Sequence, residues 1–231
     1  MVATEETLPN RSIRTGAARK PERNRRALIE ATLNSIAEKG ITDTSVSLII
    51  EKAGLSRGMI HLHFGGKDNL LAAAAEAFGT AYYEEMERQV RAAGEDPAAQ
   101  VIAVIRTDLG ETLLNQRSAR IWHAFRGEAR ANPGIAQYSD TRDLRLKAVL
   151  RDAFDRIARA EGLDDASILA RDATYGTLAL MEGMWTDYFT HSDEAFSRTS
   201  ALRIVCRFLA GLFPTHFRPA LENLQSGKSQ A

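Results

Sequence analysis

The chain has 231 residues, of which 44% are hydrophobic, and its formal net charge at neutral pH is zero. This length can build one large core, or a small domain joined to a larger one. No apolar run approaches the roughly 20 residues that span a bilayer, and the N-terminal stretch lacks the apolar segment of a secretory signal, so we expect a cytoplasmic protein with no membrane partner.

The charges are distributed unevenly along the chain. Residues 1–70 carry 11 basic and 8 acidic side chains, whereas the remainder carries 19 and 22. Seven of the basic residues lie between Arg11 and Arg26, together with a single acid, Glu22. The positive charge of the N-terminal segment attracts the phosphate groups of nucleic acid, whereas the acidic remainder of the chain is repelled by them.

Residues 1–20 are polar and basic and show no hydrophobic periodicity, so we expect them to form a disordered basic arm. Such an arm is either inert or lies along the minor groove of DNA. Pro21 suits the first turn of a helix, and an amphipathic pattern continues from there until Gly40.

Two very short helices joined by a turn are predicted between residues 45 and 64. Apolar residues of the first helix repeat at i, i+3 and i+4, and Gly54 can adopt the positive φ that ends it. Ser56 caps the second helix, whose Ile60 and Phe64 are spaced to point inward. This arrangement is typical of a helix-turn-helix.

The second short helix is expected to direct Arg57, Met59 and His61 away from the core. A helix of this width fits the major groove of B-DNA, and its N-terminal residues reach the base edges. The segment therefore predicts binding to double-stranded DNA.

Lys67 opens a long helix that continues to about Gly94 and is long enough to link a head to a body. No strand pattern stands out, so we predict an all-α chain. The further helices are expected over Pro97–Leu114, Ser118–Ala131, Ile135–Glu161, Ala166–Thr190 and Glu194–Phe213.

The last two of these helices each have a face suited to close packing against another helix. On the first it is formed by small residues and on the second by an apolar stripe: Gly176, Ala179, Gly183, Leu202, Val205, Leu209 and Leu212. These faces either fill the chain's own core or pair with a second copy. We favour a homodimer, because one head of this size makes too few contacts for useful specificity.

The residues do not favour catalysis. His61 and His63 are two apart on a helix, so they point to different sides and do not form a metal pair of the i, i+4 type. No phosphate-binding glycine loop, serine elbow or cysteine-rich metal pattern is present, and we expect no enzymatic activity, metal or cofactor. Cys206 lies among apolar residues and is expected to be a core side chain rather than a nucleophile.

The segment from Arg23 to Leu71 resembles the N-terminal signature of the TetR family of one-component regulators. The matching residues are Gly40, Ser45, Ile49, Ala53, Gly54, Leu55, Ser56, Gly58, Ile60, His63, Phe64, Lys67, Asn69, Leu70 and Leu71. The resemblance implies dimerisation through the final two helices and two heads that read a palindromic operator. The expected DNA-binding residues are Ser45, Ser56, Arg57, Gly58, Met59, His61, His63 and Lys67, with Arg57 and Met59 at base edges.

A second resemblance lies further along the chain. Residues 121–125 and 178–185 are similar to the C-terminal domain of the BetI-type subgroup, the choline-responsive repressors of betaine synthesis. It implies an effector site in which tryptophan rings face a quaternary ammonium and a carboxylate supplies the counter-charge. The expected ligand-binding residues are Trp122, Phe125, Tyr138, Glu182 and Trp185.

Two alternatives to this effector site stay open. An aromatic set at helical spacing is commonly plain core. Arg126 stands where the subgroup tends to have an aromatic residue, so an apolar or anionic effector of an efflux or catabolic operon is the second alternative.

The chain is therefore interpreted as a ligand-responsive repressor with four segments. These are a disordered basic arm (1–20), a helix-turn-helix DNA-binding domain (21–66), a helical ligand-binding and dimerisation domain (67–215) and a flexible C-terminal tail (216–231). A bound small molecule is expected to tilt the long helix that begins at Lys67 and to change the separation of the two heads.

Overall fold

The computed structural model describes residues 13–191 and 196–225, and in that part of the chain it contains ten helices and no strand. The all-α prediction is confirmed. In chain order the helices are α1 (Ile13–Lys39), α2 (Val46–Ala53), α3 (Arg57–Phe64), α4 (Lys67–Ala92), α5 (Pro97–Asp108), α6 (Gln116–Glu128), α7 (Pro133–Ala160), α8 (Ala166–Thr190), α9 (Arg198–Leu212) and α10 (Pro214–Gln225). Over the described residues, no helix has the length and apolar content needed to cross a membrane.

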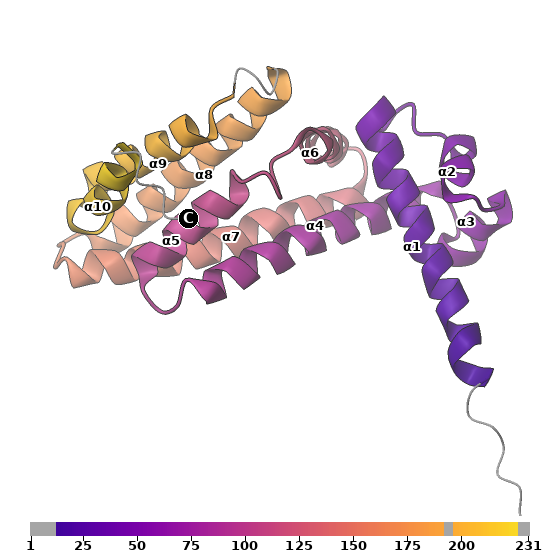
Figure 1. The fold of residues 1–231 in the computed structure, drawn as a ribbon, viewed down its shortest axis with the longest axis horizontal. Coiled ribbons are helices and arrows are strands. Elements are labelled where there is room, and N and C mark those ends of the chain that lie inside the picture. Colours follow the sequence, from indigo (N-terminus) through magenta and orange to yellow (C-terminus); the bar gives the residue numbers. More distant parts are fainter. Residues whose placement is uncertain (1–12, 192–195, 226–231) are drawn as a thin grey trace, which may run out of the picture.

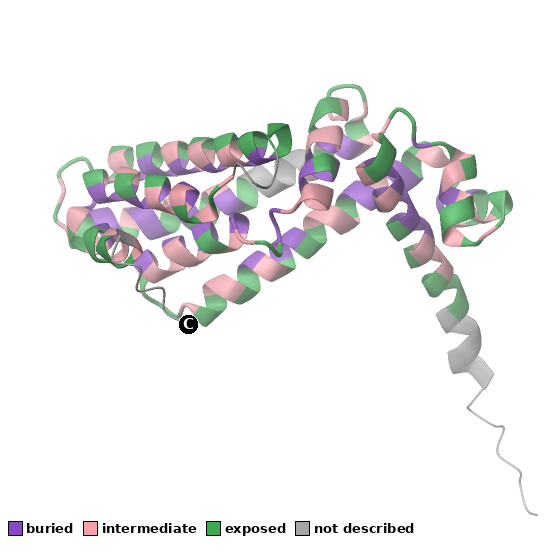
Figure 2. Ribbon diagram, turned by 45° about the horizontal axis from the view of Figure 1, so that its top comes forward, coloured by how far each residue is buried: buried purple, intermediate pink, exposed green. Residues whose placement is uncertain are grey.

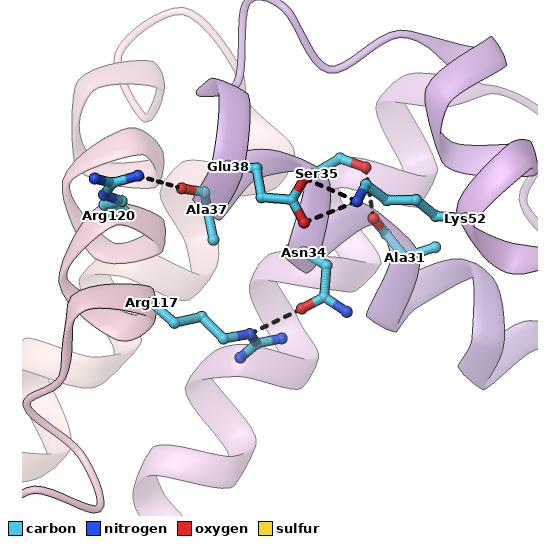
Figure 3. Close-up of polar contacts among 8 residues, drawn as sticks. All are labelled: Ala31, Asn34, Ser35, Ala37, Glu38, Lys52, Arg117 and Arg120. Carbon is cyan, nitrogen blue, oxygen red and sulfur yellow. Dashed lines mark hydrogen bonds and ion pairs between the residues drawn. The ribbon is translucent and has the colours of Figure 1, made fainter.

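Helices α1, α2 and α3 form a small head at one end of the molecule, and α4 runs from the head along the body (Figure 1). Leu28, Ile49 and Ile60 have no more than 1% of their surface exposed and form the centre of the head's core. Lys52 on α2 donates to both carboxylate oxygens of Glu38 on α1 at 2.8 Å, which holds α2 against α1 (Figure 3).

The body is a bundle in which α4, α5, α7, α8, α9 and α10 bury their apolar faces against one another (Figure 2). Its core contains Trp185, Phe154, Phe213 and Phe217, all fully buried. Cys206 is also buried, and burial raises the pKa of its thiol to about 11, so it stays protonated at neutral pH. It is a core residue, as predicted.

The first helix begins earlier than expected. Residues 13–20, assigned to the disordered arm, form the start of α1, and Pro21 lies inside this helix rather than at its first turn. Alanine, arginine and lysine precede Pro21, and their helix propensity favours continuation of the helix. The rest of the predicted arm, residues 1–12, lies outside the described residues.

The predicted C-terminal tail is also partly wrong, because residues 214–225 form α10. The rings of Phe213 and Phe217 pack on Phe154 of α7, with centroid distances of 5.7 and 6.4 Å. His216 and Glu161 add a polar contact of 2.6 Å between the start of α10 and the end of α7. Apolar residues at i and i+4 therefore extend the core beyond residue 215, while residues 226–231 lie outside the described part.

Helix α5 ends at Asp108, before the expected boundary at Leu114. A Cβ atom on Gly110 would lie 2.8 Å from the carbonyl oxygen of Arg106, so only glycine fits where the chain leaves the helix. Arg198 of α9 then donates to the carbonyl oxygens of Leu109 and Leu114, at 2.7 and 2.8 Å, and fixes the turn that leads to α6.

We expect Phe217→Ala to lower the free energy of unfolding by about 3–5 kcal/mol, because the substitution leaves a cavity among three packed rings. Denaturant unfolding followed by circular dichroism measures the change. Arg218→Ala, at an exposed position of the same helix, serves as the control and should change stability by less than about 0.5 kcal/mol. An equally small effect for both variants would contradict the packing of α10 on the body.

Candidate nucleic-acid interface and internal cavity

The turn between α2 and α3 has the local geometry that the sequence predicts. Ser45 precedes α2, and its Oγ accepts a hydrogen bond from the Leu48 N–H at 3.2 Å. Gly54 ends α2 with a φ of 63°, which lies in the left-handed region. Ser56 precedes α3 in an extended conformation but makes no capping hydrogen bond through its side chain, so the predicted side-chain cap of α3 is wrong.

The outward face of α3 consists of four residues. Arg57, Gly58, His61 and Leu62 are all exposed, whereas Ile60 and Phe64 are buried in the head. Arg57 donates to Ser47 Oγ at 3.3 Å, which links the start of α3 to α2. The His61 Nδ1 lies 3.3 Å from the Gly65 carbonyl oxygen.

Two predicted DNA-contacting residues of α3 lie differently from expectation. Met59 is half-buried and packs against the core of the head, so it is less free than predicted. His63 is half-buried, and its Nε2 is buried without a hydrogen-bond partner. His63 lies about 60° from Ile60 around the helix, at the edge of the buried face, whereas Met59 lies about 60° from the exposed Leu62 and is covered in part by the packing of the head. Lys67 is half-buried and is the first residue of α4.

Inside the body, an apolar cavity lies where four helices meet. Its free volume is ≈ 20 Å³, which is about the space that one water molecule needs. The lining residues are Ala75, Phe78, Gly79, Tyr82, Trp122, Phe125, Ile135, Tyr138 and Trp185. The structure thus brings together four of the five expected ligand-binding residues, which are Trp122, Phe125, Tyr138 and Trp185.

The aromatic residues at this cavity are held in fixed orientations. The rings of Trp122 and Trp185 meet edge to face, with centroids 6.2 Å apart. Burial and the carboxylate of Glu76 raise the pKa of Tyr138, so its hydroxyl remains protonated at neutral pH.

A buried carboxylate stands behind two of these aromatic residues and was missed by the sequence analysis. Asp108 at the end of α5 has no exposed surface and accepts hydrogen bonds from Tyr82 Oη at 2.5 Å and from Trp185 Nε1 at 2.9 Å. These partners come from α4 and α8, and only the tertiary fold joins them. The signal in the sequence was an acidic residue that follows the apolar run of α5. An acid in that position is either exposed or, when buried, hydrogen-bonded to polar partners from other helices.

Glu182, the expected counter-charge, does not line the aromatic cavity. Its carboxylate forms an ion pair with Arg126 at 3.3 Å, and the Arg126 guanidinium lies 5.0 Å from the centroid of the Trp122 ring. Both side chains line a separate, solvent-open hollow between α6, α7 and α8. Although Glu182 is one turn from Trp185 on α8, it faces this hollow and not the aromatic cavity. The ion pair with Arg126 holds its carboxylate in that position.

Helix α6 connects the cavity to the head. It carries Trp122 and Phe125 at the cavity, and its first turns contact α1 (Figure 3). Arg117 donates to Asn34 Oδ1 at 2.9 Å and to Glu30 Oε1 at 2.6 Å, and Arg120 donates to the Ala37 carbonyl oxygen at 3.3 Å. Helix α6 thus contacts both the cavity and the head.

The residues expected at a dimer interface divide into two groups. Val205 and Leu209 are fully buried in the chain's own core, and a Cβ atom on Gly176 would lie 2.3 Å from the Phe208 ring, so these three positions serve packing within one chain. Ala179 and Gly183 are exposed on α8, and Leu202 and Leu212 are half-buried on α9.

Two family models match the chain. Residues 28–74 match the model described as bacterial regulatory proteins, tetR family, and residues 97–214 match that of the BetI-type transcriptional repressor, C-terminal. The chain belongs to the TetR family. Within it, the C-terminal match identifies a DNA-binding transcriptional repressor of the BetI type.

Related proteins agree with this assignment. The chain is 32% identical to the HTH-type transcriptional regulator BetI of Stenotrophomonas maltophilia (strain R551-3) over 70% of this chain and 79% of the relative. It is 31% identical to BetI 2 of Chromohalobacter salexigens over 70% of this chain and 75% of the relative.

Solved structures share the fold of this TetR family member. A transcriptional regulator from Pseudomonas aeruginosa PAO1 superposes with a TM-score of 0.75 at 25% identity, over 86% of this chain and 94% of the other. A regulator from Saccharomonospora viridis in complex with choline superposes with a TM-score of 0.70 at 18% identity, over 81% of this chain and 96% of the other.

We expect Arg57→Ala to reduce discrimination between the operator and unrelated DNA by about 1–3 kcal/mol, because Arg57 is exposed at the start of the reading helix. Fluorescence anisotropy at constant salt, with a selected operator duplex and a scrambled duplex, measures the ratio of the two affinities. If the ratio is unchanged, Arg57 contacts phosphate or nothing at all.

Proposed function

We propose that this repressor binds a palindromic operator as a dimer and is released from it by a small organic cation of the quaternary ammonium class, such as choline. The observation that carries the proposal is the aromatic cavity backed by a buried carboxylate. Two of the four helices that line it, α4 and α6, pack directly on α1 of the head.

The chemistry of the cavity suits a cation with an apolar surface. Aromatic ring faces attract such cations, most strongly when water is excluded, and Trp122 and Trp185 supply two indoles. Asp108 accepts the N–H of Trp185 and the hydroxyl of Tyr82, and a hydrogen-bond acceptor polarises its donors so that their rings become more electron-rich. Asp108 therefore takes the supporting role that was expected of Glu182, since Glu182 is paired with Arg126.

The size of the cavity explains why binding changes the conformation. A free volume of ≈ 20 Å³ holds one water but no quaternary ammonium ion, so the rings have to move apart before a ligand fits. Packed interiors do not deform continuously, and displaced side chains move the helices that carry them. The helices at the cavity are α4, α6, α7 and α8.

Two helices transmit this movement to the head in our proposal. Helix α4 continues directly from the reading helix α3, as anticipated from the sequence. Helix α6 provides a second route, because Arg117 and Arg120 bind α1 one to two turns before Trp122 and Phe125 reach the cavity. A ligand-induced shift of α6 then rotates α1 and with it the head, so the two heads of a dimer no longer match successive half-sites.

The proposed dimer uses the outer faces of α8 and α9. Tyr175 and Ile204 are 53% and 46% exposed, and Ala179 and Gly183 lie one and two turns beyond Tyr175 with small side chains that allow close approach of a second helix. The outer face of α8 therefore carries small residues beside Tyr175, and α9 adds the exposed Ile204.

The relatives support the choice of ligand. The similar curated proteins are named BetI, and the structural neighbour from Saccharomonospora viridis holds choline. In this chain Arg126 lies against Trp122 and pairs with Glu182, which neutralises the outer carboxylate and leaves the inner aromatic cavity as the cation site.

We expect 10 mM choline to raise the melting temperature of the purified repressor, whereas 3,3-dimethylbutan-1-ol, its uncharged isostere, should leave it nearly unchanged. Binding to the native state raises stability by RT ln(1 + [L]/Kd), so the difference between the two compounds reports the contribution of the charge. Differential scanning fluorimetry measures it.

The control for this experiment is Glu182→Gln, which should keep the full choline response because Glu182 lies outside the cavity. Equal shifts from both compounds would point to an uncharged apolar effector, and no shift from either would reject the quaternary ammonium class.

We expect Arg117→Ala to retain choline binding but to lose much of the choline-induced release of DNA, because this side chain joins α6 to α1. The measurement is operator affinity with and without choline. Arg159→Ala, an exposed arginine on α7 paired only with Asp155 in its own helix, should release DNA normally. Undiminished release by Arg117→Ala would remove α6 from the transmission route.

A further inference from the structure

The reading helix carries an apolar side chain that neither the fold nor the effector site uses. Leu62 on α3 is 74% exposed, more than any other large apolar side chain in the described part of the protein. A leucine at the surface does not gain the free energy that burial in a core would provide. An exposed leucine on the helix that binds DNA therefore indicates a contact with the DNA.

Leu62 lies at the centre of the outward face of α3. Ile60 and Phe64, the buried residues of this helix, are two positions before and after it, and each is rotated from it by about 160°. Leu62 thus points directly away from the core of the head. Gly58, one turn earlier, lies about 40° from Leu62 around the helix.

The neighbours of Leu62 define what it can contact. Helix α3 packs on α1, α2 and α4, all on its inward side. Gly58 presents no side chain, and a Cβ atom there would have no neighbour within 4 Å. The backbone of α3 can therefore approach a DNA groove closely at Gly58. Leu62 is the exposed side chain one turn further along the helix.

We propose that Leu62 reads thymine in the operator by packing against the C5-methyl group of that base in the major groove. The inference rests on the DNA-binding function of the family and does not depend on the effector. It assigns to the middle of the recognition helix an apolar contact in addition to the polar contacts expected from Arg57 and His61.

The chemistry of the groove selects this partner. Thymine alone presents a methyl group in the major groove, whereas the other bases present only hydrogen-bond donors and acceptors there. A leucine side chain has no donor or acceptor, so it gains nothing from phosphate oxygens or from the polar edges of adenine, guanine and cytosine. Burial of a methyl group against leucine is favourable in proportion to the apolar area removed from water.

The test uses the full chain and a duplex selected from a random-sequence library by the native protein. Each thymine of one half-site is replaced in turn by deoxyuridine, which lacks only the C5-methyl group. At one thymine the replacement should weaken binding by the native chain about fourfold, the factor that burial of one methyl-sized group provides. Binding is measured by fluorescence anisotropy at a fixed salt concentration.

Leu62→Ala should bind the thymine and deoxyuridine duplexes with equal affinity. Leu144→Ala is the matched control, since Leu144 is a 66% exposed leucine on α7 of the body, and it should keep the native sensitivity. Because Leu62 contacts no phosphate, Leu62→Ala should also leave the slope of log affinity against log salt unchanged.

Three results would overturn the proposal. The native protein could bind equally well with deoxyuridine at every thymine of the half-site, or it could select a site without thymine. The Leu62→Ala variant could also remain as sensitive to deoxyuridine as the native chain. Failure to select any duplex is a different outcome, because it would reject operator binding by the whole protein and not the role of Leu62 alone.

Discussion

The arrangement of the molecule depends on the packing of α6 between the two hydrophobic cores. Ile121 and Phe125 belong to the core that the head shares with α4, whereas Trp122, on the next face of the same helix, belongs to the core of the body. Arg117 and Arg120 add polar contacts with α1. Because α6 contributes to both cores, a rearrangement of one core displaces side chains of the other. The packing around the cavity and the packing behind α3 are therefore coupled.

Asp108 imposes a second constraint. A carboxylate without exposed surface has to be satisfied by donors, and here the hydroxyl of Tyr82 and the indole N–H of Trp185 supply them. These hydrogen bonds fix the two rings beside the cavity and hold the ends of α5, α8 and the middle of α4 together. The same interaction thus supports the fold of the body and fixes the orientation of two of the rings at its cavity.

The sequence predicted what local geometry controls and missed what tertiary contacts control. Gly54 was identified because a left-handed residue at the end of a helix leaves a mark at a single position, whereas the capping hydrogen bond predicted for Ser56 is made by Ser45 at the start of α2 instead. Met59 was expected to be free on the outward face, whereas the most exposed large apolar side chain of α3 is Leu62. The two residues are three positions apart and so only about 60° apart around the helix, and the packing of the head around α3 decides which of them is covered. Glu182 was chosen for its closeness to Trp185 in sequence, whereas Asp108 reaches that tryptophan from 77 residues away. No spacing rule connects residues so far apart.

The small free volume of the cavity has a consequence for the proposed response to a ligand. When the competent state of a protein is rarely populated, the apparent dissociation constant rises by the inverse of that population. For the proposed effector, the threshold concentration of the response is therefore set by how tightly Phe78, Trp122 and Phe125 pack around the cavity as well as by the attraction for the ligand. Substitutions that loosen this aromatic closure can retune the detection range over evolution while the chemical selectivity stays the same.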